Sequence, residues 1–218
     1  MEILKSKVVI FGSSGHAKSL VDIIESDPNF ELVGFIDNLK LKGDEVLNYK
    51  VIGEEKSLPE LMSEYGFEHG VVGIGENFLR SRVVEKILKL VPNFQFINCI
   101  HKSANISKHI QMGVGNVVMA GASIKASSIV SNHSILNTNS SLGHDCNLED
   151  FISLAPNSAV GGNCNVGKYS HIGIGASVIQ KIDIGRNCII GGGSLVNKHT
   201  ESDSIYYGVP AKLAPKQK

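Results

Sequence analysis

An aliphatic residue recurs at every sixth position over the second half of this 218-residue chain. Counting by six from Ile100 to Val196 meets only Ile, Leu, Val or Met. Neither the 3.6-residue period of a helix nor the two-residue period of a simple strand produces this pattern. A fixed short period indicates a repeat fold, in which each repeat buries its apolar side chains against the next.

Two further positions of the six-residue repeat carry a preference. Glycine often follows the aliphatic residue directly, as in Leu142-Gly143, and a small residue often stands four positions after it, as at Cys146. We interpret these positions as a large inward side chain, a glycine that permits a turn, and a small inward side chain. Three such units predict a triangular coil of 18 residues, so that residues 100 to about 200 form five to six coils. Each coil would pair with the next at the strand spacing of about 4.8 Å.

The first part of the chain has a different pattern, in which short apolar strands alternate with amphipathic helices. Strands are predicted at 7–11, 31–36, 70–74 and 94–99, and helices at 17–25, 57–65 and 77–90. We expect Ser57 to cap the second helix, because Glu60 follows three residues later. The alternation predicts a small parallel α/β domain of the Rossmann-like type over residues 1–98, followed by the repeat domain over residues 99–218.

Composition excludes several classes of protein without changing this picture. The chain is 42% apolar, 19% charged and formally neutral, which gives no support for nucleic acid or an anionic membrane surface as a partner. No apolar run approaches the roughly 18 residues that span a bilayer, and the N-terminus does not resemble a signal peptide. No cysteine pair has CxxC spacing, and three of the four cysteines occupy the small inward position. We therefore expect reduced structural thiols, no metal and a cytoplasmic protein.

A glycine-containing turn, Gly12-Ser13-Ser14-Gly15-His16, joins the first predicted strand to the first helix. Backbone N–H groups at a helix N-terminus favour an anion such as a phosphate. Asp37 ends the second predicted strand, a place from which an acidic side chain can bind a ribose or a base edge. The turn lacks the full GxGxxG motif, so these residues alone leave an ordinary tight turn equally open.

Polar residues interrupt the repeat between Asn137 and Asp145. His144 lies two positions after the aliphatic Leu142, a phase that puts the imidazole outside the coil, where it can accept a proton near neutral pH. Asp145 follows directly and could orient the ring. Gly162 stands one predicted coil further on and should lie beside His144, with an N–H that could hold an oxyanion. For three other histidines we prefer the interpretation of a solvated side chain without function: His133, His171 and His199.

The motifs FGSSGHAKSLVDII, GFIDN and YGVPAK, in this order around the repeats, resemble the sialic acid O-acetyltransferase and nucleotide-aminosugar N-acetyltransferase family. The resemblance implies a left-handed parallel β-helix, acetyl-CoA as co-substrate, and a nucleotide-linked amino sugar held by the first domain. It further implies a homotrimer whose cofactor lies between neighbouring β-helices. It assigns the catalytic role to His144 with Asp145.

The same resemblance assigns binding residues by motif. The nucleotide-sugar would be contacted by Gly12, Ser13, Ser14, Gly15, His16, Asp37, Asn38 and Gly53. Acetyl-CoA would be contacted by Ser153, Gly162, Ile174, Gly192 and Lys212. Ser153 stands where some relatives have a histidine, and Asn38 where many have an acid or a lysine.

We therefore predict an acetyl-CoA-dependent N-acetyltransferase that acts on a UDP-linked 4-amino-4,6-dideoxy sugar for surface-glycan or glycoprotein synthesis. His144 would serve as general base in a direct attack of the amine on the thioester. Two alternatives stay open: O-acetylation of a sialic-acid-like sugar, and a non-catalytic scaffold that only binds a nucleotide-sugar. The polar break around His144 argues against the scaffold. Only a nucleotide-linked substrate needs the GSSGH turn as a phosphate cradle.

Overall fold

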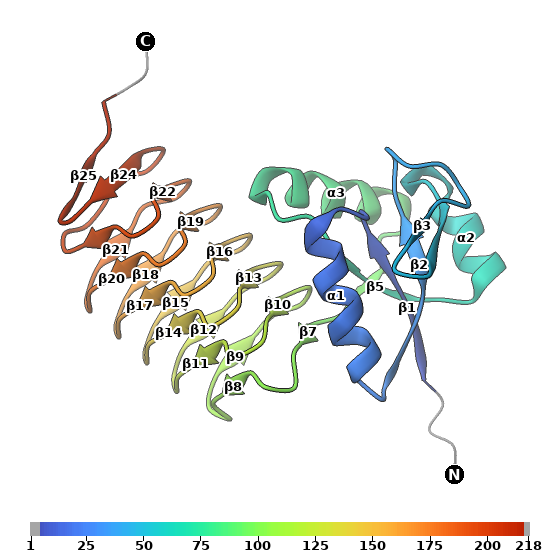
Figure 1. Cartoon of the computed structure of the whole chain (residues 1–218), viewed down its shortest axis with the longest axis horizontal. Helices are drawn as coiled ribbons and strands as arrows, with labels where there is room; N and C mark the ends of the chain where they lie inside the picture. The colour runs from blue at the N-terminus through green and yellow to red at the C-terminus, as the bar shows by residue number, and fades with distance from the viewer. Residues whose placement is uncertain (1–4, 216–218) are drawn as a thin grey trace. The chain divides into compact units, whose positions relative to one another are not determined.

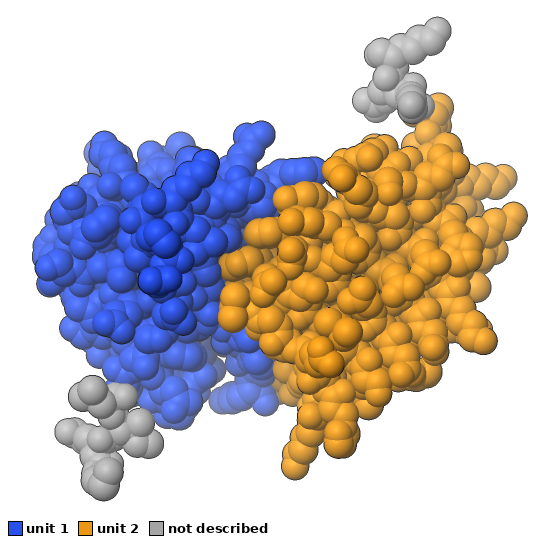
Figure 2. All heavy atoms as spheres, turned by 180° about the vertical axis from the view of Figure 1, so that it is seen from behind, with its two compact units in different colours: residues 1–102 blue, residues 103–218 orange. Residues whose placement is uncertain are grey.

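The computed structural model describes residues 5–215 of a chain that divides into two compact units, residues 1–102 and residues 103–218 (Figure 2). This division lies four residues beyond the boundary that the change of pattern predicts, between 98 and 99. Among residues 5–215, no helix is long and apolar enough to cross a membrane.

The first unit is an α/β fold (Figure 1). Its six-stranded sheet has the order β3-β4-β2-β1-β5-β6. The central strand β1 (Ser6–Phe11) pairs in parallel with β2 (Phe30–Ile36) and with β5 (His69–Val72). The chain therefore builds outward on one side of β1 and then continues on the other side with β5. In such sheets the carboxyl ends of the two strands at the reversal form the ligand crevice.

The remaining elements of this unit are the outer strands of the sheet, the helices between its strands, and one short strand outside the sheet. They are α1 (Gly15–Ser26), β3 (Glu45–Val46), β4 (Tyr49–Gly53), the 3₁₀ turn η1 (Glu55–Ser57), α2 (Leu58–Tyr65), α3 (Asn77–Leu90), β6 (Gln95–Phe96) and β7 (Cys99–Ile100). Val8 to Phe11 are fully buried, which is why β1 reads as a continuous apolar run and not as an alternating one.

Two expectations for this unit were wrong. Within residues 5–215, the side chain of Ser57 makes no capping hydrogen bond, because residues 55–57 already form the η1 turn that continues directly into α2. The strand predicted at 94–99 is two separate strands of two residues each, β6 and β7. The sequence pattern also missed the β3–β4 hairpin, because strands of two and five residues are too short to establish an alternation.

The second unit is a parallel β-helix of very short strands. Within this unit, one sheet runs β25-β24-β22-β19-β16-β13-β10, a second runs β23-β20-β17-β14-β11-β8, and a third runs β21-β18-β15-β12-β9. Leu142 pairs with Val160, and Leu154 with Ile172, so the coil has the predicted length of 18 residues. All four of these side chains are buried, as expected for an internal aliphatic ladder.

The strands of the β-helix have the following bounds: β8 (Asn105–Ile106), β9 (Gln111–Met112), β10 (Val117–Val118), β11 (Ser123–Ile124), β12 (Ile129–Val130), β13 (Ile135–Leu136), β14 (Ser141–Leu142), β15 (Asn147–Leu148), β16 (Ser153–Leu154), β17 (Ala159–Val160), β18 (Asn165–Val166), β19 (His171–Ile172), β20 (Ser177–Val178), β21 (Asp183–Ile184), β22 (Ile189–Ile190), β23 (Leu195–Val196), β24 (Ile205–Gly208) and β25 (Ala211–Leu213). All pairs among them are parallel except the closing pair of β24 and β25.

The glycine that often follows the aliphatic residue has a different role from the one that we expected. The backbone turns two positions later, at residues with positive φ such as Asp145 (56°) and Asn163 (58°). Glycine is needed at position 143 because a Cβ there would lie 2.5 Å from the backbone nitrogen of Gly162 in the next coil. Close approach of successive coils, and not the turn, therefore selects glycine at this position.

One of the three histidines expected to be solvated is buried. His133 is 6% exposed, and its ring stacks on Phe151 of the next coil with 5.1 Å between ring centroids. Tyr169 extends the same stack by a further coil, at 5.7 Å from Phe151. The expectation was wrong because three ring-bearing residues share one corner position, and a repeat of this length places them on top of one another.

Candidate active site

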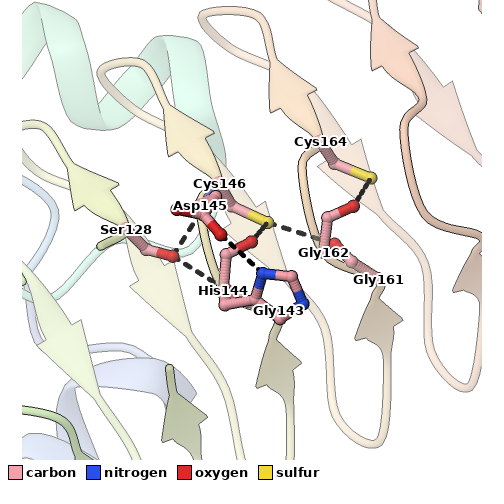
Figure 3. Close-up of polar contacts among 8 residues, drawn as sticks. All are labelled: Ser128, Gly143, His144, Asp145, Cys146, Gly161, Gly162 and Cys164. Atoms are coloured by element: carbon pink, nitrogen blue, oxygen red, sulfur yellow. Dashed lines mark hydrogen bonds and ion pairs between the residues drawn. The ribbon is translucent and has the colours of Figure 1, made fainter. Parts of the chain in front are cut away.

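His144 lies on the corner that follows β14, and its side chain is 63% exposed. Its Nδ1 is 2.6 Å from Oδ2 of Asp145 (Figure 3). Because a carboxylate only accepts hydrogen bonds, this partner assigns the imidazole proton to Nδ1 and leaves Nε2 as an acceptor. Asp145 lies at the turn of this corner, with a positive φ of 56°. A histidine with this partner and this exposure can remove a proton from a bound molecule.

Gly162 lies directly against the imidazole. A Cβ at this position would be 2.7 Å from both Cε1 and Nε2 of His144, so only glycine fits without displacing the ring. The carbonyl oxygen of Gly161 accepts a hydrogen bond from the buried thiol of Cys146, at 3.1 Å. Because the C=O and N–H of a trans peptide point in opposite directions, the Gly162 N–H points out of the coil. A proton acceptor and a backbone donor therefore stand side by side on one corner.

The exposed Ile174 and its neighbour Gly192 occupy a different corner of the β-helix. Ile174 follows β19 of the first sheet and is 61% exposed, and a Cβ on Gly192 would lie 3.0 Å from its Cγ2. His144 instead follows β14 of the second sheet. The two groups thus flank one sheet and do not meet at one point of a single chain.

The other two residues that the resemblance assigns to acetyl-CoA also lie apart from His144. Ser153 is in β16 of the first sheet and is 5% exposed. Lys212 is exposed in β25, where it pairs with Tyr207 in the antiparallel closing ladder. Within the chain, only Gly162 among the predicted cofactor residues lies beside the histidine.

In the first unit, the glycine turn lies at the carboxyl end of β1. Ser13 is buried and its hydroxyl donates to Oδ2 of Asp37 at 2.6 Å, while the Leu39 N–H donates to Oδ1 at 2.7 Å. Burial opposes ionisation of Asp37, but these hydrogen bonds outweigh burial and hold the pKa of the carboxyl below its usual value. The turn and the end of β2 are thereby tied together around a carboxylate that stays charged.

A shallow pocket of about 280 Å³ opens beside this tie. It is lined by Ser13, Ser14, Gly15, Lys18, Asp37, Leu39 and Lys40. Ser14 is the N-cap residue of α1, but its side chain accepts no capping hydrogen bond from the described residues. The uncapped N–H groups of α1, together with the charges of Lys18 and Lys40, make this pocket attractive to an anion.

Sequence reasoning missed both lysines of this pocket, although a signal for Lys18 was present. A basic residue in the first turn of a helix is unfavourable for the helix dipole unless an anion is bound there. Lys18 is such a residue, since α1 begins at Gly15. Lys40 lies in the loop after β2, and its Nζ is 3.5 Å from the Ser13 carbonyl oxygen.

Four of the predicted nucleotide-sugar residues lie outside this lining: Gly12, His16, Asn38 and Gly53. Asn38 accepts the Glu55 N–H through Oδ1 at 3.1 Å, and the Gly53 carbonyl accepts the Asp37 N–H at 3.0 Å. His16 is largely buried, and among the described residues its Nε2 has no hydrogen-bond partner. Burial, followed by the charge of Arg80, lowers its pKa to about 4, so the ring is neutral at physiological pH.

No group of three or more His, Cys, Asp or Glu side chains within residues 5–215 is arranged to hold a metal ion. The four cysteines are all buried and unpaired.

Comparison with known proteins places the whole chain in one family. The family model described as the PglD N-terminal domain matches residues 7–87. A point mutant of perosamine N-acetyltransferase from Caulobacter crescentus, solved in complex with CoA and GDP-perosamine, is 33% identical and superposes with a TM-score of 0.91. That match covers 97% of this chain and 98% of the other. The chain belongs to the nucleotide-aminosugar N-acetyltransferase family, a family of acyltransferases.

Two other members of this family extend the comparison. The acetyltransferase domain of PglB from Neisseria gonorrhoeae, in complex with acetyl coenzyme A, is 29% identical with a TM-score of 0.89; the match covers 96% of this chain and 100% of that one. The UDP-N-acetylbacillosamine N-acetyltransferase of Bacillus subtilis is 32% identical over 113 residues. That match covers 52% of this chain, and the chain spans about half, 51%, of the curated relative's length.

Proposed function

We propose that this chain is an acetyl-CoA-dependent N-acetyltransferase that acts on the amino group of a nucleotide-linked sugar. The observation that carries the proposal is the His144 imidazole, paired with Asp145 and set against Gly162 on an exposed corner of the β-helix. Relatives support the substrate classes, since one was solved with CoA and GDP-perosamine and another with acetyl coenzyme A.

The proposed chemistry is a direct acyl transfer. The sugar amine attacks the thioester carbonyl carbon and forms the C–N bond, while Nε2 of His144 takes the proton that the amine loses. The negative charge that develops on the carbonyl oxygen is stabilised by the outward N–H of Gly162. Collapse of the tetrahedral intermediate breaks the C–S bond, and the imidazolium returns its proton to the CoA sulfur. Asp145 keeps Nε2 in the acceptor state at the start of each cycle.

In the proposed function, the first unit binds the nucleotide part of the substrate. A nucleotide diphosphate suits the pocket at the amino end of α1, because Lys18 and Lys40 add two positive charges to the helix dipole. The charged Asp37 suits a ribose hydroxyl or a base edge. We propose a 4-amino-4,6-dideoxy sugar on UDP or GDP, used in surface-glycan or glycoprotein synthesis.

The proposed assembly is a homotrimer in the cytoplasm. His144 and Ile174 are both mostly exposed and lie on different corners of the β-helix, so one chain leaves a bound thioester open to water. A neighbouring β-helix packed against the His144 corner would bring the Ile174 corner of the second chain to the base. The four unpaired thiols support a reducing compartment.

An acetyl-transfer assay tests the proposed function. Purified chain is incubated with acetyl-CoA and, in parallel, with UDP-, GDP- and dTDP-linked 4-amino sugars and with free sialic acid. We expect release of the CoA thiol and an acetamido product, identified by mass spectrometry and NMR, with one of the nucleotide-linked amines. Acetylation of a hydroxyl on free sialic acid would instead support the O-acetyltransferase alternative. Tight binding of a nucleotide-sugar without any transfer would support the scaffold.

A further inference from the structure

A column of small polar side chains runs inside the β-helix behind the His144 corner (Figure 3). Ser128, Cys146 and Cys164 occupy the same position in successive coils, and all three are buried. Each donates a hydrogen bond to a carbonyl of the following coil. The accepting oxygens are those of Gly143 at 2.8 Å, Gly161 at 3.1 Å and Ile179 at 3.2 Å, respectively. The first two of these carbonyls belong to the peptides that precede His144 and Gly162.

We propose that Ser128 and Cys146 are positioning residues for acetyl transfer: Ser128 holds the turn that carries His144, and Cys146 sets the direction of the Gly162 N–H. Neither side chain is accessible to a substrate, so both act only through the backbone that they hold. The inference rests on the proposed function, because it assigns roles to the neighbours of the proposed base.

Ser128 brackets the His144 turn from both ends. Its hydroxyl donates to the Gly143 carbonyl and accepts the Cys146 N–H at 3.1 Å, so the residues on either side of His144 and Asp145 are tied to one oxygen atom. A serine hydroxyl has one proton and two lone pairs, which makes both bonds compatible. Between them, Asp145 adopts a left-handed conformation, which most residues other than glycine, asparagine and aspartate disfavour. Loss of the bracket would let this turn relax and move the imidazole.

Cys146 acts on the peptide above the ring. Its thiol has one proton and lies 3.1 Å from the Gly161 carbonyl oxygen and 3.5 Å from that of His144, so the bond to Gly161 is the stronger. A carbonyl held inward turns the amide of the same peptide outward. Burial disfavours a charged thiolate, so the Cys146 thiol keeps its donor proton.

The chain provides a matched control on another corner. Ser134 is fully buried, donates to the Glu149 carbonyl at 3.3 Å and accepts the Ile152 N–H at 3.2 Å. Ser134→Ala therefore removes one hydroxyl oxygen, one donated and one accepted hydrogen bond, as Ser128→Ala does, but on a corner away from His144. The column itself suggests the conservative variants, because it uses serine and cysteine in the same position. These variants are Ser128→Cys and Cys146→Ser.

The test compares five full-length variants with the parent: Ser128→Ala, Ser128→Cys, Ser134→Ala, Cys146→Ala and Cys146→Ser. The nitrogen chemical shifts of the His144 imidazole and the Gly162 amide are measured by NMR on ¹⁵N-labelled protein. We expect Ser128→Ala and Ser134→Ala to lower the melting temperature alike, while only Ser128→Ala moves the imidazole shifts. Cys146→Ala should move the Gly162 amide shift, and both conservative variants should restore the parent's shifts.

Kinetics provide the second measurement. Ser128→Ala should lower kcat about 10–100-fold, the range expected for a misplacement of about 1 Å, with both KM values changed less than about threefold. Cys146→Ala should lower kcat by roughly tenfold, and the conservative variants should recover most of each loss. Ser134→Ala should keep kcat within about twofold of the parent, since its two hydrogen bonds lie on another corner.

Equal shifts and equal kcat for Ser128→Ala and Ser134→Ala would overturn the role of Ser128. An unchanged Gly162 amide shift in Cys146→Ala would overturn the positioning role of Cys146. This variant also tests the proposal if Ser128→Ala does not fold. Because the NMR measurement needs no substrate, a parent that acetylates no nucleotide-sugar would contradict the proposed function alone. The shifts would then still decide the positioning roles.

Discussion

Gly162→Ala tests the geometry of the His144 corner with a single methyl group. The added Cβ would lie 2.7 Å from Cε1 and Nε2 of the imidazole, whereas ordinary contacts begin near 3.4 Å. The ring must therefore move by at least about 0.7 Å or rotate away, and it can do so because the side chain is 63% exposed. Position 162 has no positive φ, so alanine adds no backbone strain there. The backbone N–H that we assign to the oxyanion is kept.

We expect Gly162→Ala to lower kcat about 10–100-fold, because a displacement near 1 Å is enough to cost about two orders of magnitude in a positioned reaction. The melting temperature should fall by no more than about 2 °C, since the collision is with the free end of a side chain. Steady-state kinetics with acetyl-CoA and the accepted amino sugar, together with thermal unfolding, measure both quantities.

Gly143→Ala is the matched control, one coil below. Its Cβ would lie 2.5 Å from the Gly162 nitrogen and 2.6 Å from the Gly161 carbonyl carbon, which are backbone atoms of the next coil and cannot swing aside. We expect a loss of stability of about 1–3 kcal/mol, as for other overpacked sites. The reasoning would be refuted if Gly162→Ala destabilised the protein as much as Gly143→Ala while leaving kcat within twofold of the parent.

Three further predictions address the base, the nucleotide pocket and the assembly. His144→Ala should lower kcat by about 10²–10⁴-fold and leave acetyl-CoA affinity nearly unchanged. Steady-state kinetics measure kcat, and calorimetry measures the affinity. A kcat within a few-fold of the parent would show that His144 is not the base. Asp37→Asn should raise KM for the nucleotide-sugar far more than KM for acetyl-CoA. Because the folded pKa of Asp37 is lowered from 3.8, its stabilising effect is present above that pH and is lost as the pH falls through the lowered value. The melting temperatures of parent and Asp37→Asn should therefore differ at pH 7 and converge in acid, and a constant difference would contradict the assignment. Light scattering should give three times the 23.4 kDa of one chain, and a fully active monomer would refute the shared site.

Much of the fold could be predicted because its strongest signal is a strict period. Seventeen consecutive aliphatic positions predict the coil length, and the pairing of Leu142 with Val160 confirms it. A period says where a side chain recurs, however, and not which force selects it. Gly143 was therefore assigned to the turn, although its real constraint is the backbone of the next coil. His133 was assigned to solvent for the same reason, because its burial comes from a ring one coil away.

The candidate site likewise has one part that the repeat predicts and one part that it does not. His144, Asp145 and Gly162 could be placed together in advance because each coil repeats after 18 residues, and the structure brings them together. The nucleotide pocket depends on loops, where no period operates. Lys40 approaches the Ser13 carbonyl because the loop after β2 folds back toward the glycine turn. Neither the residue types nor their spacing in the sequence predicts that this loop folds back.

The register of the coils also supports the proposal that the active site is shared between chains. Residues on one corner differ by multiples of 18, as His144 and Gly162 do, whereas His144 and Ile174 differ by 30. The proposed base and the proposed cofactor contacts are therefore kept on opposite edges of one sheet in every coil, and no rearrangement of side chains can bring them together. In the proposed trimer, a second β-helix whose Ile174 corner faces the first chain's His144 corner would join the two halves and shield the thioester from water. Three chains arranged with three-fold symmetry would satisfy this requirement at every corner pair, since each chain presents one edge to each neighbour.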